Sequence, residues 1–447
     1  MQKKVGVVSL GCDKNLVDTE IMLGILKSEG FEITTLPEEA DILIVNTCGF
    51  IKSAKQETIN TILEFAQYKK NRRNLILIAT GCFVQRYKKV LEKEFPEVDV
   101  FLGVSDYHYV VNAIKEALKG KKVMKITKPT HFTLDNIPRV RSTSASSAYV
   151  KISEGCNNNC SYCVIPKIKG EFKSRPMEAI LKEVNELVEQ GIKEIVFIGQ
   201  DTTKYGEDLY GDYKLPLLLQ KTAEIKDVGW IRILYCYPDS ITDELIDVMA
   251  NEEKICKYLD IPFQHCSDNI LKKMNRSITR KDIEKLIKKL REKIPNITLR
   301  STFIIGFPGE TKEHFMELLD FLKENKLDRV GMFTYSREEG TAAAKMPFQV
   351  PERIKKIRLN KAMKLQKQIS LEKNRQLVGR KFKVLVEGST EKKGWYYGRS
   401  ERDAPDIDGF IYFYSQNCSV GDFVMVNILH GLEYDLIGEM EDVYKSS

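Results

Sequence analysis

Residues 148–163 read AYVKISEGCNNNCSYC, a short β-type run followed at once by three cysteines. Further runs of the same kind follow, each succeeded by helix-compatible sequence: EIVFIG (194–199), WIRILYC (230–236), YLDIPF (258–263), TLRSTFIIGF (298–307) and RVGMFTYS (329–336). Short apolar runs that alternate with helical periodicity indicate parallel βα units. The pattern predicts a partial TIM-like (βα)6 barrel, a fold whose chemistry lies at the carboxyl ends of its strands.

Two regions flank this predicted barrel, which is expected to span residues 148–375. Residues 1–120 also alternate Val/Ile/Leu runs with amphipathic segments, which predicts an α/β domain with a doubly wound parallel sheet. Residues 121–147 contain a polar, proline-containing stretch without periodicity and are interpreted as a linker. Residues 376–447 contain short β-type runs separated by Gly and Asp turns, which predicts a small OB-like all-β barrel.

The composition indicates a folded, multi-domain protein. The chain has 447 residues, of which 43% are hydrophobic and 30% charged, and its formal net charge is +7. No apolar run approaches the ~18–20 residues that span a bilayer, and the run Val5–Leu10 lacks the length and cleavage site of a secretion signal. We therefore expect a soluble, cytoplasmic protein without a membrane partner. The mild positive charge does not by itself identify a nucleic-acid-binding protein.

Ten cysteines in such a chain favour metal or catalytic chemistry over a disulfide framework. The clearest pattern is Cys156-x3-Cys160-x2-Cys163, directly after the first barrel run. Three thiolates at this spacing can hold a 4Fe-4S cluster and leave one iron open for a substrate or cofactor. The alternative is a structural zinc site, which normally has four protein ligands. Neither Cys nor His follows this motif before Cys236, so a fourth ligand is missing.

Three other cysteines share a position at the end of a strand. Cys12, Cys48 and Cys82 end the runs VSLGC, IVNTC and IATGC of the N-terminal domain. The carboxyl ends of parallel strands meet along one edge of a sheet, so we expect these thiols to meet and hold a second cluster. Each of them alone would be interpreted as an inert buried thiol. The remaining cysteines lack such a pattern and are assigned to packing: Cys236, Cys256, Cys266 and Cys418.

The Cys156 motif, inside a six-fold βα pattern and with Tyr162 before its last cysteine, resembles the radical S-adenosylmethionine superfamily. The resemblance implies that the open iron chelates S-adenosylmethionine, whose one-electron reduction yields methionine and a 5′-deoxyadenosyl radical. It also implies that Tyr162 lies against the adenine; a packed aromatic ring is the alternative. Similar superfamily segments and the strand-end rule suggest further cofactor contacts. These are Gly199, Gln200, Asp201, Arg300 and Thr302.

Two other segments near predicted strand ends give weaker signals. Gly306–Glu310 resembles superfamily segments that contact the cofactor, although a turn of Gly and Pro explains it equally well. Gln264 and His265 follow the fourth barrel run and are expected near the barrel mouth. A lone His is as often a structural residue as a functional one.

Over essentially its whole length the chain resembles the methylthiotransferase family, which joins a flavodoxin-like domain with strand-end cysteines, a radical S-adenosylmethionine barrel and a TRAM β-barrel. The resemblance implies two 4Fe-4S clusters, one that delivers sulfur and one that makes the radical. It implies one S-adenosylmethionine as methyl donor, another as radical source, and an electron donor such as flavodoxin or ferredoxin. No side chain is predicted to be catalytic, because the clusters carry the chemistry.

The family has two main substrates, an isopentenylated adenosine of tRNA and an aspartate of ribosomal protein uS12. Three segments resemble the uS12 branch: Ser9–Asp18, Asp403–Gly409 and Glu433–Glu439. Position 13 is Asp, where that branch usually has Pro. The predicted reaction is therefore methylthiolation of the β-carbon of that aspartate. The tRNA reaction is the first alternative, and a noncatalytic two-cluster electron carrier or scaffold is the second.

The charge distribution also favours a protein substrate. Residues 376–447 carry a net charge of −4 and the rest of the chain +11. RNA binding requires a cationic surface, whereas an acidic barrel complements a basic ribosomal protein; improved solubility is the alternative explanation. Residues 353–375 contain nine Lys/Arg and one Glu. We interpret this basic helix as a solvated face, with direct contact to ribosomal RNA as the alternative.

Overall fold

The computed structural model describes residues 2–72, 74–129, 138–142 and 146–443. Its contacts divide the chain into two compact units, each described here by itself. Unit 1 comprises Met1–Ser142, Ser153–Arg175 and Ser336–Ala344, and unit 2 comprises Thr143–Ile152, Pro176–Tyr335 and Lys345–Ser447. This grouping cuts across the predicted domain boundaries, because the Cys156 motif belongs to unit 1. Parts of the predicted linker, 130–137 and 143–145, lie outside the described residues.

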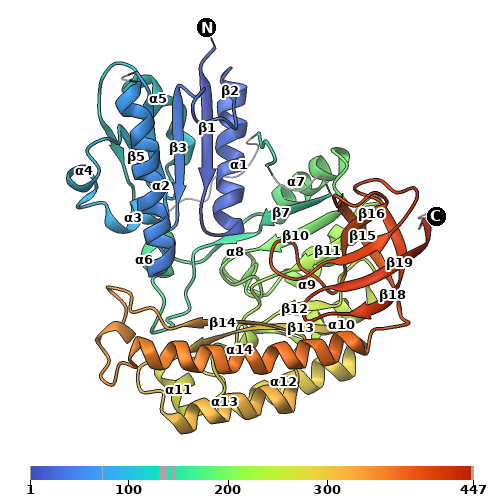
Figure 1. The fold of residues 1–447 in the computed structure, drawn as a ribbon. Helices are drawn as coiled ribbons and strands as arrows, with labels where there is room; N and C mark the ends of the chain where they lie inside the picture. Colours follow the sequence, from blue (N-terminus) through green and yellow to red (C-terminus); the bar gives the residue numbers. More distant parts are fainter. Residues whose placement is uncertain (1, 73, 130–137, 143–145, 444–447) are drawn as a thin grey trace. The chain divides into compact units, whose positions relative to one another are not determined.

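Unit 1 is built on a six-stranded parallel sheet of order β2-β1-β3-β4-β5-β6 (Figure 1). Its strands are β1 (Lys4–Ser9), β2 (Glu32–Ile33), β3 (Ile42–Thr47), β4 (Ile76–Gly81), β5 (Val100–Leu102) and β6 (Val123–Lys125). The main helices are α1 (Asp13–Ser28), α2 (Lys52–Asn71), α3 (Cys82–Tyr87), α4 (Leu91–Glu94) and α5 (Val110–Ala117), with a 3-10 turn η1 (Tyr107–Tyr109). The segment with the Cys156 motif adds β8 (Ser153–Glu154), α6 (Ile165–Lys169) and β9 (Lys173–Ser174).

The central strands of unit 1 are covered on both faces. Every residue of β3 and β4 is buried, as a parallel sheet between two helical layers requires. One core packs α1 and α5 against the sheet, and the other packs α2, α3 and α4 against its opposite face. The predicted parallel α/β domain is confirmed.

Unit 2 contains six parallel barrel strands in two sheets of order β11-β10-β7 and β12-β13-β14, with a parallel bridge between Ile231 and Ile255 (Figure 1). The strands are β7 (Ser147–Lys151), β10 (Glu194–Ile198), β11 (Trp230–Ile233), β12 (Tyr258–Asp260), β13 (Thr298–Ile305) and β14 (Arg329–Thr334). The helices are α7 (Met177–Glu189), α8 (Glu207–Tyr210), α9 (Leu215–Ala223), α10 (Asp243–Asn251), α11 (Asp268–Lys273), α12 (Arg280–Lys293), α13 (Lys312–Asn325) and α14 (Glu352–Arg375). The 3-10 turn η2 (Pro238–Ser240) also belongs to unit 2, whereas η3 (Ala343–Lys345) begins with the last two residues of unit 1. These strands are the six predicted runs, so the partial barrel is confirmed.

Strand β13 shows how the barrel presents polar side chains. Leu299 and Phe303 are buried in the core beneath the surrounding helices. The alternate residues Arg300, Thr302 and Ile304 are partly exposed, because successive side chains of a strand point to opposite faces. Arg300 and Thr302 therefore face away from the helical core.

The C-terminal part of unit 2 is a closed five-stranded barrel of order β15-β16-β17-β19-β18. Its strands are β15 (Lys381–Ser389), β16 (Trp395–Ser400), β17 (Ile411–Tyr414), β18 (Phe423–Gly431) and β19 (Leu436–Val443). Val384, Phe413 and Val426 are fully buried in its core. The closed order leaves no unpaired edge strand, and the predicted OB-like barrel is confirmed.

The small barrel is joined to the six-stranded barrel by residues 399–408, which include most of the Asp403–Gly409 motif. The Arg399 guanidinium lies 2.5 Å from the Glu194 carboxylate, and Arg329 lies 2.6 Å from Asp403. The Tyr258 hydroxyl donates to Asp408 at 2.6 Å. The barrel partners Glu194, Tyr258 and Arg329 are each the first residue of their strand, so residues 399–408 close the amino-terminal end of the barrel.

No helix among the described residues combines the length and the apolar character needed to cross a membrane.

Candidate functional site

The N-terminal cysteines all lie at the carboxyl edge of the unit 1 sheet. Cys12 caps α1 just after β1, Cys48 directly follows β3, and Cys82 follows β4 as the first residue of α3. These strands are neighbours in the sheet. At Gly11 (φ +96°) an added Cβ would lie 2.7 Å from the Cys48 sulfur, so the Cys48 thiol lies against the backbone next to Cys12. The structure therefore brings the three strand ends together.

Asn15 links these strand ends and was missed by the sequence reasoning. Its side-chain amide donates to the carbonyl oxygens of Leu10 at 2.9 Å and Thr47 at 3.0 Å. Its Oδ1 lies 3.7 Å from the Cys82 sulfur, within reach of the thiol proton. The only sequence signal was its place in Ser9–Asp18, one helical turn after Cys12. One buried amide thus contacts segments from β1, β3 and β4.

The pKa values of these thiols depend on burial and on the charges of their neighbours. Burial raises the pKa of the Cys82 thiol to about 12, and the charges of Cys12 and Cys48 raise it further, while the Lys169 ammonium lowers it. Burial also raises the pKa of Cys48, with the same opposing effect of Lys169. Such thiols stay protonated in the metal-free protein, and metal ligation would release their protons.

The second cysteine group lies between β8 and α6. The Asn158 amide donates to the Cys156 sulfur and the Ile165 amide to the Cys163 sulfur, each at 3.4 Å. Burial raises the pKa of Cys163 to about 12, and the hydrogen bond from Ile165 opposes this rise. Hydrogen bonds to cysteine sulfur favour the thiolate and tune iron–sulfur clusters.

The backbone before this group has room only for glycine. Gly155 has φ +76°, and an added Cβ would lie 2.1 Å from the Glu171 carbonyl oxygen. Strands β8 and β9 pair on either side of the segment, with Ser153 opposite Ser174. The loop that carries the three thiols is therefore closed at its base by a pair of short strands.

Both cysteine groups belong to unit 1. Cys82 packs with Val104, Val164 and Ile168, the last two from the segment just after Cys163. The Cys156 segment thus contacts the N-terminal sheet domain, although the sequence continues directly into the barrel.

Three family models match the chain. They are the radical SAM superfamily over residues 150–322, an uncharacterized family named UPF0004 over residues 4–103, and the TRAM domain over residues 378–440. A protein of Desulforamulus reducens named ribosomal protein uS12 methylthiotransferase RimO is 52% identical over 439 residues, which cover 98% of this chain and 99% of that protein. The protein of the same name from Pelotomaculum thermopropionicum is 53% identical, with the same coverage of both chains.

The chain belongs to the RimO family. The similarity to TsrM from Kitasatospora setae, a radical S-adenosylmethionine methyltransferase solved with cobalamin and a [4Fe-4S] cluster, is one of fold alone. The TM-score is 0.55 at 14% identity, covering 89% of this chain and 81% of that one.

In this RimO-family chain, the other predicted cofactor contacts lie in different places. Tyr162 is half-buried in unit 1, next to Cys163. The other residues belong to unit 2, where Gly199, Gln200 and Asp201 follow the carboxyl end of β10. The Asp201 carboxylate is buried and accepts a 2.6 Å hydrogen bond from Thr203. These three residues lie where a barrel of this class presents ligands.

Arg300 lies near the amino-terminal end of its strand, β13, and not at the carboxyl end. It is the third of eight residues in β13, and Thr302 follows it on the same face. Its guanidinium lies 2.7 Å from Asp260 and 3.8 Å from Asp408 of the closing segment. Both carboxylates hold Arg300 at the amino-terminal half of the barrel, away from Gly199–Asp201.

His265 and Gly306–Glu310 form part of one buried network. The Nδ1 of His265 accepts a 2.9 Å hydrogen bond from the Ser267 amide, and its Nε2 lies 3.7 Å from Glu310. Glu310 also pairs with Arg358 of α14 at 2.7 Å and accepts from the Gly306 amide at 2.6 Å. Burial alone would raise the pKa of Glu310, but these partners lower it. The network ties the turn after β13 to α14.

Helix α14 uses some of its cations for packing and exposes others. Lys355 is buried, with its ammonium 2.8 Å from the Tyr335 carbonyl oxygen. Lys373 pairs with Asp328 at 2.8 Å. Lys356, Lys361 and Lys364 are exposed, so the predicted solvated face covers only part of the helix.

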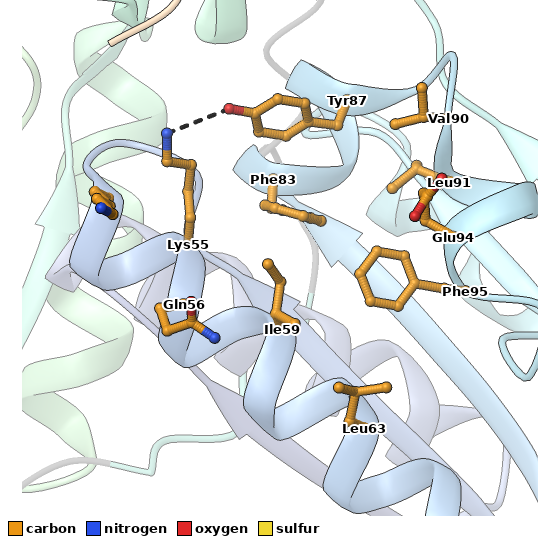
Figure 2. Close-up of a pocket in the computed structure, with 11 residues that line it drawn as sticks. Lys55, Gln56, Ile59, Leu63, Phe83, Tyr87, Val90, Leu91, Glu94 and Phe95 are labelled. Atoms are coloured by element: carbon orange, nitrogen blue, oxygen red, sulfur yellow. Dashed lines mark hydrogen bonds between the residues drawn. The ribbon is translucent and has the colours of Figure 1, made fainter. Parts of the chain in front are cut away.

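Unit 1 also has an apolar groove that the sequence did not indicate. It measures about 470 Å³ and lies between α2 and the α3–α4 segment, as Figure 2 shows. Phe83, the residue after Cys82, lies on its wall and contacts the rings of Tyr87 and Phe95 at centroid distances of 4.9 and 6.0 Å. At one end, Lys55 and Arg86 share the Glu338 carboxylate, each at 2.7 Å. The groove is therefore lined by the residue that directly follows the buried Cys82.

Proposed function

We propose that this chain methylthiolates the β-carbon of an aspartate in ribosomal protein uS12 by radical S-adenosylmethionine chemistry. The observation that carries this proposal is the similarity, at about 50% identity over nearly the whole chain, to proteins named for that activity. The UPF0004, radical SAM and TRAM regions follow one another along this chain. The acidic small barrel supports a basic protein partner over RNA.

The proposal assigns one 4Fe-4S cluster to Cys156, Cys160 and Cys163. Amide hydrogen bonds to two of these sulfurs support it, because such donors stabilise thiolate ligands. When bound, this cluster supplies the electron that cleaves S-adenosylmethionine to methionine and a carbon radical. Tyr162, Gly199, Gln200, Asp201 and Thr302 are proposed to orient the cofactor. Arg300 is proposed to support Thr302 from the same strand, through its ion pairs with Asp260 and Asp408.

The proposal assigns a second 4Fe-4S cluster, as sulfur donor, to Cys12, Cys48 and Cys82. Their common sheet edge and the contact between Asn15 and Cys82 support it. Among the described residues, no three Cys, His, Asp or Glu side chains converge as ligands of a single metal ion. Each of the three thiols would hold a separate iron of such a cluster, which would supply the sulfur.

The closing segment 399–408 is proposed to keep water from the barrel interior. A carbon radical abstracts hydrogen from unintended donors unless the site excludes them. The buried pairs Arg399–Glu194 and Arg329–Asp403 occupy the end of the barrel opposite the usual catalytic end. This role requires no chemistry of the segment itself.

The proposed partners follow from this reaction. uS12 is the substrate, free or in the small subunit, and the location is cytoplasmic because a ribosomal protein is modified. A flavodoxin or ferredoxin is proposed as the electron donor. The exposed lysines of α14 are the proposed place for any direct contact with ribosomal RNA.

Mass spectrometry of uS12 from cells with and without the gene tests the proposal. We expect a methylthiolated aspartate in wild-type cells, its loss in the deletion strain, and its return with the wild-type gene but not with Cys160→Ala. An unmodified aspartate in both strains would contradict the uS12 assignment. Loss of a methylthio nucleoside from tRNA would support the tRNA reaction instead. Reduced protein that leaves S-adenosylmethionine intact would indicate a noncatalytic carrier.

A further inference from the structure

Unit 2 contains a cavity that the proposed function does not use. It measures about 460 Å³ and lies between the first residues of β14, one face of α14 and two segments of the small barrel. All of its lining residues belong to unit 2. Ligand sites in proteins measure roughly 300–1,000 Å³, so this cavity is large enough to receive a whole side chain of a partner protein.

The two small-barrel segments that line the cavity are the ones that resemble the uS12 branch. The end of Asp403–Gly409 lines one part of it, and Tyr434 and Asp435 line another. Asp403–Gly409 lies just before β17, and Tyr434 and Asp435 directly precede β19. Because these two strands pair in parallel, the residues before them lie side by side. The fold therefore brings both segments to one cavity.

The unpaired charge of this cavity is negative. Four charged side chains of its lining each face an opposite charge 2.6–3.8 Å away: Arg300, Asp328, Arg329 and Asp408. Asp435 is different, because it forms no ion pair with any described residue. Its Oδ1 accepts a 2.8 Å hydrogen bond from the Phe410 amide. The guanidinium groups of the lining are thus already neutralised, and the remaining carboxylate favours a cationic ligand.

Aromatic rings line the cavity together with this carboxylate. Phe410, Tyr412 and Tyr434 belong to the same lining as Asp435, and Tyr434 is 50% exposed. Tyr397 of β16 packs beside them, with its ring centroid 5.2 Å from that of Phe410 and 6.3 Å from that of Tyr412. Aromatic faces attract cations, and the planar guanidinium of arginine stacks on them while it pairs with a carboxylate. The lining therefore combines the two groups that recognise arginine.

We propose that this cavity binds an arginine side chain of the basic protein uS12, with its guanidinium held by the Asp435 carboxylate and the aromatic rings. This inference rests on the proposed function, in which uS12 is the substrate. Arg300 places the cavity at the amino-terminal half of the six-stranded barrel, whereas Gly199–Asp201 lie at the carboxyl end, where such barrels carry their chemistry. The cavity is therefore a docking site that is separate from the site of the reaction.

Binding of purified uS12 to the anaerobically reconstituted full-length chain tests this site. Asp435→Asn removes the charge, and its amide oxygen can still accept the hydrogen bond from Phe410. Tyr434→Ala removes an exposed ring, so the two variants are independent if one of them fails to fold. Glu391→Gln and Tyr414→Ala are the matched controls. Glu391 is an exposed carboxylate and Tyr414 a 48% exposed ring on the same small barrel, and neither lines the cavity.

We expect uS12 to bind about tenfold more weakly to Asp435→Asn and about fivefold more weakly to Tyr434→Ala, since a charged hydrogen bond is worth more than one cation–π contact. Both controls should stay within about twofold of the wild type. The cavity variants should raise the KM for uS12 more than they lower kcat, because the cavity is a docking site. A folded cavity variant with unchanged uS12 binding would overturn the inference.

Two small probes separate this inference from the proposed function. N-acetyl-argininamide and N-acetyl-citrullinamide have the same shape, and only the first is charged. The wild type should bind the arginine probe more tightly than the citrulline probe, and Asp435→Asn should lose this preference. Equal binding of both probes by the wild type would overturn the inference. Cavity variants that keep uS12 binding but lose binding to ribosomal RNA would also overturn it. Failure of the proposed function would instead leave the uS12 aspartate unmodified while the preference for the arginine probe remains.

Discussion

Replacing Glu194 by Gln should destabilise unit 2 by about 3 kcal/mol at neutral pH. The Glu194 carboxylate is fully buried and faces two guanidinium groups, Arg232 at 2.8 Å and Arg399 at 2.5 Å. It also accepts a 2.8 Å hydrogen bond from the Ser147 hydroxyl. The neutral amide would keep the shape of the side chain but would leave Arg232 without this anion in a buried site. Arg399 would keep its ion pair with Glu387, at 2.6 Å, and its hydrogen bond to the Asp403 carbonyl oxygen.

The magnitude follows from the pKa of Glu194. Burial alone would raise this pKa, but the charges of Arg399 and Arg232 lower it from 4.5 to about 2. Each unit is worth about 1.4 kcal/mol, which gives roughly 3 kcal/mol at neutral pH. Removing one partner of a buried ion pair typically costs about 3–5 kcal/mol, in agreement. Because the folded pKa is depressed, this stability is present above about pH 4.5 and is lost as the pH falls toward 2.

Urea unfolding followed by tryptophan fluorescence measures this effect, because both tryptophans, Trp230 and Trp395, belong to unit 2. Glu284→Gln is the control, since Glu284 forms an exposed pair with Arg280 at 2.7 Å and should change the unfolding free energy by less than about 1 kcal/mol. The difference between wild type and Glu194→Gln should shrink as the pH falls below about 4.5. A difference under about 1 kcal/mol at pH 7, or one that does not change with pH, would refute the reasoning.

Two further predictions concern unit 1. If each cysteine group holds one cluster, Cys48→Ala and Cys160→Ala should each remove about half of the iron from anaerobically reconstituted protein. The control Cys236→Ala, in the buried core of unit 2, should remove none. An iron count that falls to zero with either single substitution would contradict independent clusters. Phe83→Ala should lower the free energy of unfolding of unit 1 by about 3 kcal/mol, because the Phe83 ring packs on Tyr87 and Phe95. Leu63→Ala in the same groove should lower it by less than about 1 kcal/mol, since the Leu63 side chain is 47% exposed. Hydrogen exchange of unit 1 amides measures both losses, and equal losses would contradict this packing of the groove.

The Asp403–Gly409 motif also has a structural role, because most of it lies in the closing segment 399–408. From the sequence alone, this motif indicates only a resemblance to the uS12 branch. In the structure Asp403 and Asp408 contact strands of the six-stranded barrel, through Arg329 and Tyr258. A motif that resembles a family signature can thus owe its residues to the attachment of one barrel to another, independently of any contact with substrate.

Local sequence determined much of this protein. The alternation of apolar runs and helical periodicity predicted the sheet of unit 1, the six barrel strands and the small closed barrel. It also placed Cys12, Cys48 and Cys82 at strand ends, because the residue that follows a strand is a local property. The spacing of Cys156, Cys160 and Cys163 is local in the same sense.

Only the tertiary structure decided which distant residues meet. Lys169 and Asp18 are 151 residues apart, and Arg399 and Glu194 are 205 apart. Neither pair has a periodic signal, because each depends on how whole elements pack after the chain has closed long loops. The grouping of the Cys156 segment with the N-terminal sheet has the same origin. Side chains of opposite charge become partners only where packing buries them together, and a linear pattern of residues does not encode that burial.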